Sequence, residues 1–266
     1  MLKMDKFNNI KGFLAHEEGL FLYRLTKEYC LNGVAVEIGS YCGKSACYIG
    51  QACKENNTQL ITIDHHRGSE EQQLGQEYFD PEEFDYKKNR VDTLPTLLKN
   101  IRKHELDNFV KALVGDSASA AKNLEDNLDL VFIDGSHTFE SARLDYASWK
   151  GKIRKGGILA IHDIYDTEAD GGQAPKEIYE KALKESEIIF LEGYLWDEGE
   201  PKSAFDKAMS IAKTKAMSLS DQFCVERHKN SFLDLVKNKL DITFANEQEI
   251  NSLINTDSFE EVVTFG

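Results

Sequence analysis

The sequence predicts a doubly wound α/β fold with a mostly parallel sheet and a helical C-terminal extension. Two patterns support this prediction. Short apolar runs rich in Val, Ile and Leu recur without polar alternation, which is typical of strands buried on both faces. The segments between these runs carry apolar residues at helical spacing. Strand, helix and strand in this order favour right-handed crossovers between parallel strands.

Five apolar runs are the predicted strands of the main sheet: Val34–Ile38, Leu60–Asp64, Val110–Val114, Leu128–Ile133 and Ile158–His162. A sixth strand-like run, Ile188–Leu195, follows a stretch with helical character. The helix after the first run has one apolar face made of Ala46, Ile49, Gly50 and Cys53. The helix after the fourth run has a similar face made of Phe139, Ala142, Tyr146 and Trp149.

The 266 residues suit one α/β domain with additions. We expect a main domain over residues 1–198 and a mainly helical extension over 199–266, with helices at Ala204–Ser218 and Phe232–Leu240 and a β-prone tail at Val262–Phe265. The extension is expected either to cap the substrate pocket or to form a dimer interface. The long polar stretch 65–91 predicts a lid over the site, because long loops in compact domains are often functional.

The composition excludes several partners. The chain has 46 acidic and 32 basic residues, a net charge of −14, and no basic stripe, so neither nucleic acid nor an anionic membrane is an expected partner. No apolar run approaches the roughly 20 residues that span a bilayer, and the polar N-terminus lacks a signal-peptide pattern. The five cysteines show no metal-binding or disulfide pattern, which favours a reduced, cytoplasmic setting with buried thiols. A homodimer is the default assembly for a chain of this size.

A glycine-containing loop, Gly39–Ser45, follows the first predicted strand, and ligands of open α/β sheets bind beyond the carboxyl ends of the strands. A phosphate-binding P-loop has four residues between its first glycine and Gly-Lys-Ser, whereas this loop has three. A dinucleotide loop has a glycine where Tyr41 stands. Glu37 would repel a pyrophosphate but can organise a cationic aminoacyl group. The loop therefore favours a ligand without phosphates.

Acidic residues recur at the ends of the five main strands: Glu37, Asp64, Asp116, Asp134 and Asp163. Asp64 is at the distance from the glycine loop that suits ribose hydroxyls. Asp116 can cap the next helix or accept a hydrogen bond from an adenine amino group. Five acids at one rim indicate a polar cleft that tolerates positive charge.

Three strings together resemble the class I S-adenosylmethionine (SAM)-dependent methyltransferases: V-E-I-G-S-x-x-G-K-S at 36–45, F-I-D-G-S-H-T-F-E at 132–140 and K-G-G-I-L-A-I-H-D at 155–163, with Trp149 between the last two. The similarity is greatest to the macrocin-type branch of small-molecule O-methyltransferases. It covers residues 33–166, with weaker support to Trp196. The resemblance implies a Rossmann-like fold.

The resemblance also implies functional residues. The SAM-binding residues would be Glu37, Gly39, Ser40, Gly43, Ser45, Asp64, Asp116, Ser117 and Asp134. In the metal-dependent members, the Asp of D-G-x-H and an acidic pair after the fifth strand hold Mg²⁺, and the His of that motif is the base. Asp134, Asp163 and His162 are then the candidate ligands, and His137 is the candidate base. His162 replaces an acid of that pair, and a hard cation prefers oxygen ligands, so metal dependence stays open.

The predicted function is SAM-dependent methyl transfer to a hydroxyl of a small molecule, such as a sugar or phenol. An imidazole suits removal of the hydroxyl proton near neutral pH. An N-methyltransferase of the same fold and a non-catalytic SAM-binding or interaction protein are the alternatives. Tyr146 and Lys150 match the Y-x-x-x-K pair of short-chain dehydrogenases, but Tyr146 lies on an apolar helix face and is expected in the core. The adjacent His65 and His66 are expected to begin a polar loop, and Asp166–Gly172 lacks the calcium-loop pattern and is expected to be a mobile loop beside the site.

Overall fold

The computed structural model describes residues 4–76, 78–164, 173–196 and 200–256. The chain forms two compact units, Met1–Ile178 and Tyr179–Gly266. The division falls within helix α6, Gln173–Glu185. It comes before the predicted boundary at residue 198, because the strand that follows α6 belongs to the sheet of the second unit.

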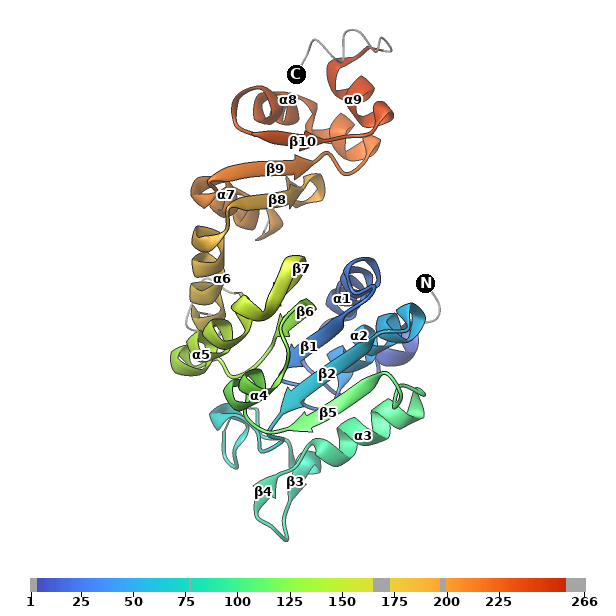
Figure 1. Ribbon diagram of the computed structural model, residues 1–266, viewed down its shortest axis with the longest axis vertical. Coiled ribbons are helices and arrows are strands. Elements are labelled where there is room, and N and C mark those ends of the chain that lie inside the picture. Colours follow the sequence, from blue (N-terminus) through green and yellow to red (C-terminus); the bar gives the residue numbers. More distant parts are fainter. Residues whose placement is uncertain (1–3, 77, 165–172, 197–199, 257–266) are drawn as a thin grey trace. The chain divides into compact units, whose positions relative to one another are not determined.

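The first unit is built on five parallel strands in the order β5-β2-β1-β6-β7 (Figure 1). Their bounds are β1 Val34–Ile38, β2 Gln59–Asp64, β5 Val110–Val114, β6 Leu128–Ile133 and β7 Ile153–Ile161. All five predicted strands of the main sheet are thus confirmed. The chain runs outward from β1 through β2 to β5 and then returns to β6 on the other side of β1. This reversal places a ligand-binding crevice at the carboxyl ends of β1 and β6.

Strand β7 begins earlier than predicted and pairs irregularly with β6. Ile153 lies opposite Leu128, but Ile158 lies opposite Leu130, so the intervening residues of β7 bulge out of register. Pairing is regular again where Ile161 lies opposite Ile133. The residues that follow β7 therefore leave the sheet beside those that follow β6.

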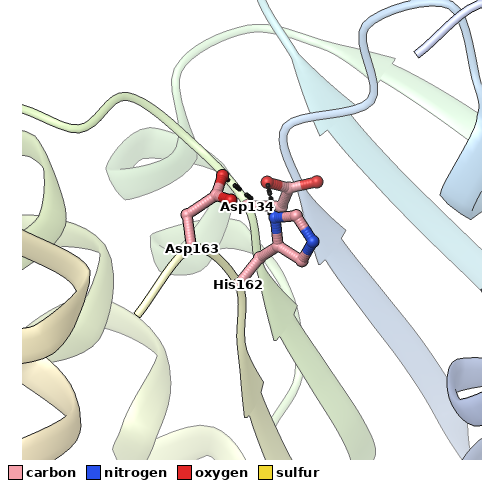
Figure 2. A group of neighbouring side chains, drawn as sticks. All are labelled: Asp134, His162 and Asp163. Carbon is pink, nitrogen blue, oxygen red and sulfur yellow. Dashed lines mark ion pairs between the residues drawn. The ribbon is translucent and has the colours of Figure 1, made fainter. Parts of the chain in front are cut away.

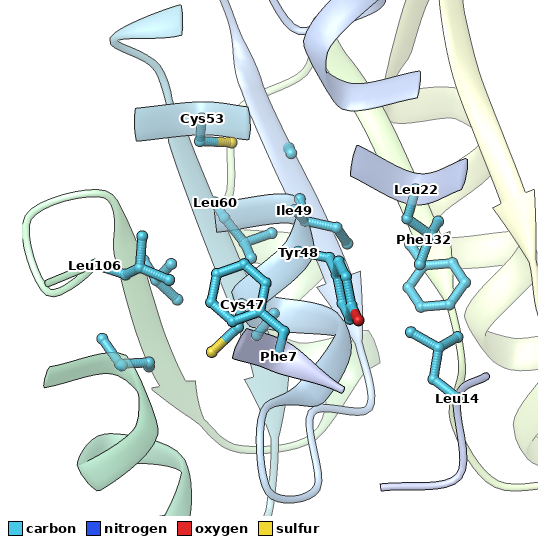
Figure 3. Close-up of a cluster of buried hydrophobic side chains, with 14 of the residues drawn as sticks. Phe7, Leu14, Leu22, Cys47, Tyr48, Ile49, Cys53, Leu60, Leu106 and Phe132 are labelled. Atoms are coloured by element: carbon cyan, nitrogen blue, oxygen red, sulfur yellow. The ribbon is translucent and has the colours of Figure 1, made fainter. Parts of the chain in front are cut away.

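A large apolar core lies between the sheet and the helices α1 (His16–Tyr29), α2 (Lys44–Asn56) and α3 (Leu94–Lys103). Figure 3 shows side chains of α1, α2 and the strands meeting in this core. Its members include Leu22, Tyr48, Ile49, Leu60, Leu97 and Phe132. All five cysteines of the chain are free and buried. The helices α4 (Ser117–Asn123) and α5 (Phe139–Trp149) pack against each other (Figure 1).

The stretch 65–91 contains two 3-10 helices, Glu70–Gln72 and Pro81–Glu83, and a hairpin of β3 (Phe84–Asp85) with β4 (Arg90–Val91). An ion pair of 2.7 Å joins Asp80 of this stretch to Lys11. The Tyr41 hydroxyl of the glycine loop donates a hydrogen bond of 2.9 Å to the same carboxylate. Asp80 therefore ties together the N-terminal segment, the glycine loop and the stretch 65–91.

The second unit contains a parallel sheet of three strands in the order β10-β9-β8, with bounds β8 Ile188–Glu192, β9 Thr214–Ser218 and β10 Ile242–Phe244. Its helices are α7 Glu200–Ile211, α8 Gln222–Asn238 and α9 Glu247–Ile254. Helices therefore follow the main domain, as predicted. The expectation of one helix over Ala204–Ser218 was wrong for its last part, since Thr214–Ser218 is β9.

The helix predicted at Phe232–Leu240 corresponds to the second half of α8. The expected β-prone tail Val262–Phe265 and the Asp166–Gly172 loop lie outside the described residues. None of the helices in the described ranges is long and apolar enough to cross a membrane.

Candidate functional site

A cavity of about 900 Å³ opens at the carboxyl ends of the first unit's strands. Its walls come from the glycine loop, the ends of β1, β2, β5 and β6, the N-terminal segment and the stretch 65–91. The residues predicted for the site that line this cavity are Gly39, Ser40, Ser45, Asp64, Asp116, Ser117, Asp134, His137 and Asp163. Glu37, Gly43 and His162 do not line it and lie behind its walls.

The glycine loop depends on two glycines that are held in left-handed backbone conformations. At Gly39, φ is +89°, and an added Cβ would lie 1.9 Å from the carbonyl oxygen of Asp134. At Gly43, φ is +87°, and a Cβ would lie 2.4 Å from Leu97 Cδ1. Only glycine fits both the backbone angle and the space at these positions. Gly43 therefore allows the loop to pack closely against α3. Gly39 allows the loop to pass directly over the end of β6.

Asp64, at the end of β2, accepts backbone hydrogen bonds that fix the glycine loop. Its Oδ2 accepts from the amides of Ser40 at 3.1 Å and Tyr41 at 2.9 Å. Its Oδ1 accepts from the amide of His66 at 2.7 Å. The carboxylate still faces the cavity. Because each carboxylate oxygen has two lone pairs, it retains the capacity to accept a further hydrogen bond from a ligand.

Glu37 is completely buried behind the cavity wall. The Thr62 hydroxyl donates a hydrogen bond to its Oε2, and its Oε1 has no hydrogen-bond partner in the described part of the chain. Burial raises the pKa of Glu37 to about 8, although Ser45 and Thr62 act in the opposite direction. Ser45 lines the cavity, so it stands between Glu37 and any bound ligand.

The wall beside β5 has a carboxyl group that the sequence analysis did not identify. Asp116 caps α4 by accepting from the Ser119 amide at 2.8 Å, and the Ser117 hydroxyl accepts from Trp149 Nε1 at 2.6 Å. Asp145 of α5 is buried and also lines the cavity. Burial raises the pKa of Asp145 to about 6, against the effect of Ser117.

The sequence does contain a signal that identifies Asp145 as a candidate site residue. Asp145 is three residues after Ala142 and four before Trp149, both on the predicted apolar face of the helix. An acid on such a face must be buried, and a buried acid in a wall of a cleft is a candidate site residue.

Histidines and carboxylates meet where β6 and β7 end. His162 Nδ1 lies 3.3 Å from Asp134 Oδ1 and 3.0 Å from Asp163 Oδ2 (Figure 2). His137 Nε2 lies 3.1 Å from the same Asp163 oxygen. The sheet register explains the meeting, because β6 and β7 end side by side.

The charges in this group perturb one another. Burial alone would lower the pKa of His162, but Asp134 and Asp163 raise it to about 11. Burial disfavours ionisation of Asp163, yet His137 and His162 hold its pKa well below its usual range. Burial raises the pKa of Asp134, with His162 opposing the effect.

A divalent cation fits these residues. One ligand atom each from Asp134, His162 and Asp163 can be chosen so that all lie within 4.8 Å of one another. Both ring nitrogens of His162 are buried, and neither makes a hydrogen bond of good geometry to the described residues. The donor set of two carboxylates and an imidazole can therefore hold a metal ion.

Other candidate residues have structural roles. Tyr146 is buried in the core, as predicted. His66 is also buried, and its Nδ1 lies 2.7 Å from the Thr93 hydroxyl, whereas His65 lines the cavity. The two adjacent histidines thus lie in different environments, because the backbone turns at His66, where φ is +57°.

Residues 36–164 match the family described as "Methyltransferase domain". Similar solved structures include the O-methyltransferase TomG from Streptomyces achromogenes, with 14% identity, a TM-score of 0.48, and coverage of 69% of this chain and 75% of that one. An O-methyltransferase from Bacillus cereus has 16% identity, a TM-score of 0.46, and coverage of 70% and 78%. Residues 36–164 of the first unit are thus similar to a methyltransferase domain, and the cavity lies at the carboxyl ends of their strands.

Proposed function

We propose that this chain transfers a methyl group from SAM to a hydroxyl group of a small molecule. One observation carries the proposal. A histidine paired with a carboxylate, His137 with Asp163, lies on the wall of the cavity that the glycine loop and the strand ends of a methyltransferase domain enclose. The two groups are a base and its orienting acid in the place where a methyl acceptor would bind.

The cofactor would occupy the side of the cavity formed by the glycine loop. Gly39 and Ser40 bring the backbone close to the ligand, Asp64 faces the ribose position, and Ser117 lies at the adenine position. SAM supplies a methyl group on a positively charged sulfur, and the acidic residues of the rim favour a cation there.

His137 would take the proton of the acceptor hydroxyl as the methyl group moves. Asp163 holds the imidazole and stabilises the positive charge that forms on it. The main contribution of the cavity walls is to hold the acceptor oxygen in line with the methyl group. A base of this kind accelerates such reactions by about 10²- to 10⁴-fold.

A divalent metal held by Asp134, His162 and Asp163 would lower the pKa of the acceptor hydroxyl and orient it. Asp134 and Asp163 line the cavity with His137, and His162 lies behind the cavity wall beside both carboxylates. His137 and the metal ligands would thus act on the same oxygen. The two carboxylates also place negative charge beside the reacting centre, which favours a cationic cofactor over an anionic one.

Aromatic side chains at the cavity mouth support a ring-shaped acceptor such as a phenol or sugar. Phe13 and Tyr78 both line the cavity with more than two-fifths of their surface exposed. Their ring centroids lie 5.6 Å apart, and Phe13 also contacts Tyr41 at 5.5 Å. Exposed aromatic rings provide flat apolar contact area for another ring.

The test is a transfer assay with methyl-labelled SAM against sugars, phenols and amines. We expect label in a hydroxylated acceptor, and a 10²- to 10⁴-fold lower turnover in His137→Asn, with binding of S-adenosylhomocysteine retained. His104→Gln is the control, because His104 packs against Phe7 and does not line the cavity. Label in amines alone, or full turnover in His137→Asn, would contradict the proposal.

A further inference from the structure

We propose that the ends of β6 and β7 form a centre for a divalent first-row transition metal, of the Mn²⁺, Fe²⁺, Co²⁺ or Zn²⁺ class, in preference to Mg²⁺. His162 Nδ1 supplies the nitrogen ligand, and Asp134 and Asp163 supply oxygen ligands. The inference deepens the proposed function, because it rests on metal assistance to methyl transfer and names the class of ion.

The spacing of the donor atoms fits one shared ion. Ligand bonds of about 2.1 Å at right angles or at tetrahedral angles place neighbouring donor atoms about 3.0 to 3.4 Å apart. The distances from His162 Nδ1 to the two carboxylates are 3.3 Å and 3.0 Å. An ion between His162 Nδ1 and either carboxylate would therefore require little movement, and the three ligand atoms all lie within 4.8 Å of one another.

The orientation of His162 points to a metal ligand. Its Nδ1 faces both carboxylates, while its Nε2 lies 3.3 Å from Glu18 Oε2 on the opposite side of the ring (Figure 2 shows the three proposed ligands). A carboxylate on the far nitrogen is the usual companion of a metal-binding histidine, because it fixes the ring and its tautomer. Glu18 is itself held, since its Oε2 accepts from the Ala15 amide at 2.7 Å. We therefore assign Glu18 as a positioning residue for His162.

The contacts of His162 are poor as hydrogen bonds. Neither ring nitrogen donates to these carboxylates with good geometry in the described part of the chain, although three carboxylate oxygens lie within 3.3 Å. The ring nitrogens are also shielded from water, so water cannot satisfy them. A metal at Nδ1 would replace the proton there and satisfy the imidazole and both carboxylates together.

The donor chemistry selects the class of ion. Mg²⁺ requires near-octahedral oxygen coordination and loses its water reluctantly. An imidazole nitrogen suits Zn²⁺, Fe²⁺ and similar ions, and carboxylates are accepted by Mn²⁺ as well. A set of one nitrogen and two carboxylate oxygens therefore favours the transition metals. Because these ions bind most mixed sites more tightly than Mg²⁺, the diagnostic quantity is how the preference changes when His162 changes.

The experiment measures metal binding to the full chain, freed of metal by EDTA and dialysis. Mn²⁺, Co²⁺ and Mg²⁺ are titrated separately by calorimetry into the wild type and into His162→Asp. We expect one site per chain, and the Co²⁺-to-Mg²⁺ affinity ratio should fall at least about 10-fold in His162→Asp, whose donor set is all oxygen. The visible absorption spectrum of bound Co²⁺ should change in the same variant, because its nitrogen ligand is lost.

Glu18→Gln provides a second variant that keeps all three ligands and can still cap the helix. It should weaken Co²⁺ and Mn²⁺ binding about 10- to 100-fold, with a smaller effect on Mg²⁺. His104→Gln is the control and should change neither affinity. If no ion binds the folded wild type, or if neither His162→Asp nor Glu18→Gln alters the ratio, the proposal is overturned.

The absence of binding would leave His162 as an imidazolium that bridges two carboxylates. A parallel titration of S-adenosylhomocysteine into the same samples separates this failure from failure of the proposed function. Cofactor binding without metal binding overturns only the metal centre. Metal binding without cofactor binding overturns methyl transfer.

Discussion

The two sides of the cavity use the same residue type in different ways. On the glycine-loop side, Asp64 accepts three backbone hydrogen bonds and Asp116 caps a helix. On the side where β6 and β7 end, Asp134 and Asp163 face the imidazole of His162. The first pair of acids fixes the backbone around the cavity, and the second pair belongs to the group for which we propose a chemical role. A strand-end acid thus has no fixed role, and its hydrogen-bond partners decide between the two.

We expect substitutions on the glycine-loop side of the cavity to cause the largest losses of folding stability. Gly39→Ala should destabilise the chain by at least about 4 kcal/mol, because the new Cβ would meet a backbone oxygen that cannot move aside. Gly75→Ala is the matched control, with a similar φ of +88° and no atom within 4 Å of the Cβ. Its cost should be only about 1 kcal/mol. Urea unfolding of both variants measures the difference, and equal costs would show that close packing at Gly39 is unimportant.

Behind the same loop, Glu37 should make stability depend on pH. Its pKa is about 8 in the folded chain against 4.5 when unfolded, so the folded state binds the extra proton between these values. Stability should therefore fall as pH rises from about 4.5 to 8, by roughly 3 to 5 kcal/mol at most. Glu37→Gln removes this dependence and should be more stable than the wild type at pH 8.

Unfolding free energies at pH 5, 6.5 and 8 measure this difference. Glu105→Gln, at an exposed glutamate, is the control and should follow the wild type at every pH. Parallel curves for Glu37→Gln and the wild type would mean that Glu37 is ionised throughout.

The role of Asp64 as a backbone acceptor predicts a smaller cost. Asp64→Asn keeps the shape but weakens charge-assisted bonds from Ser40, Tyr41 and His66, which should cost about 2 kcal/mol. Hydrogen exchange should show the loss at the amides of Ser40 and Tyr41. An unchanged unfolding free energy and unchanged exchange would assign Asp64 to ligand binding alone.

The smallest expected effect is at Asp116. Asp116 caps α4, so Asp116→Ala should lower the free energy of unfolding by about 1 kcal/mol. Asp116→Asn should lower it very little, because Asn caps a helix as well. Thermal unfolding of the two variants measures this pair of effects. If Asp116→Asn instead impaired cofactor binding with no change in stability, Asp116 would be a direct ligand residue.

Much of the first unit could be predicted from sequence. The five strands are short, buried and rich in branched apolar residues, so their pattern is strong. Their order places the predicted acids and His137 at one edge, and most of them do line one cavity. The candidate site could therefore be predicted from the residues at the strand ends, because the position of a strand end depends more on local sequence than on distant contacts.

Other features depended on tertiary packing. Strand β9 contains Lys215 and Met217, which have weak β preference, and it forms because it pairs with β8 and β10 on either side. Asp145 was overlooked because the helix was identified from its apolar residues alone. The burial of Glu37 was also not evident, since a strand-end acid can face either a ligand or the core.

We propose that the glycine-loop side of the cavity binds the cofactor independently of the side where β6 and β7 end. The most direct test is calorimetric titration of S-adenosylhomocysteine into the full chain, in EDTA, with the wild type and Asp163→Asn. We predict micromolar binding, on the order of −8 kcal/mol, that agrees within about threefold between the two proteins. No heat from folded wild-type protein, or binding that vanishes in Asp163→Asn, would contradict the account.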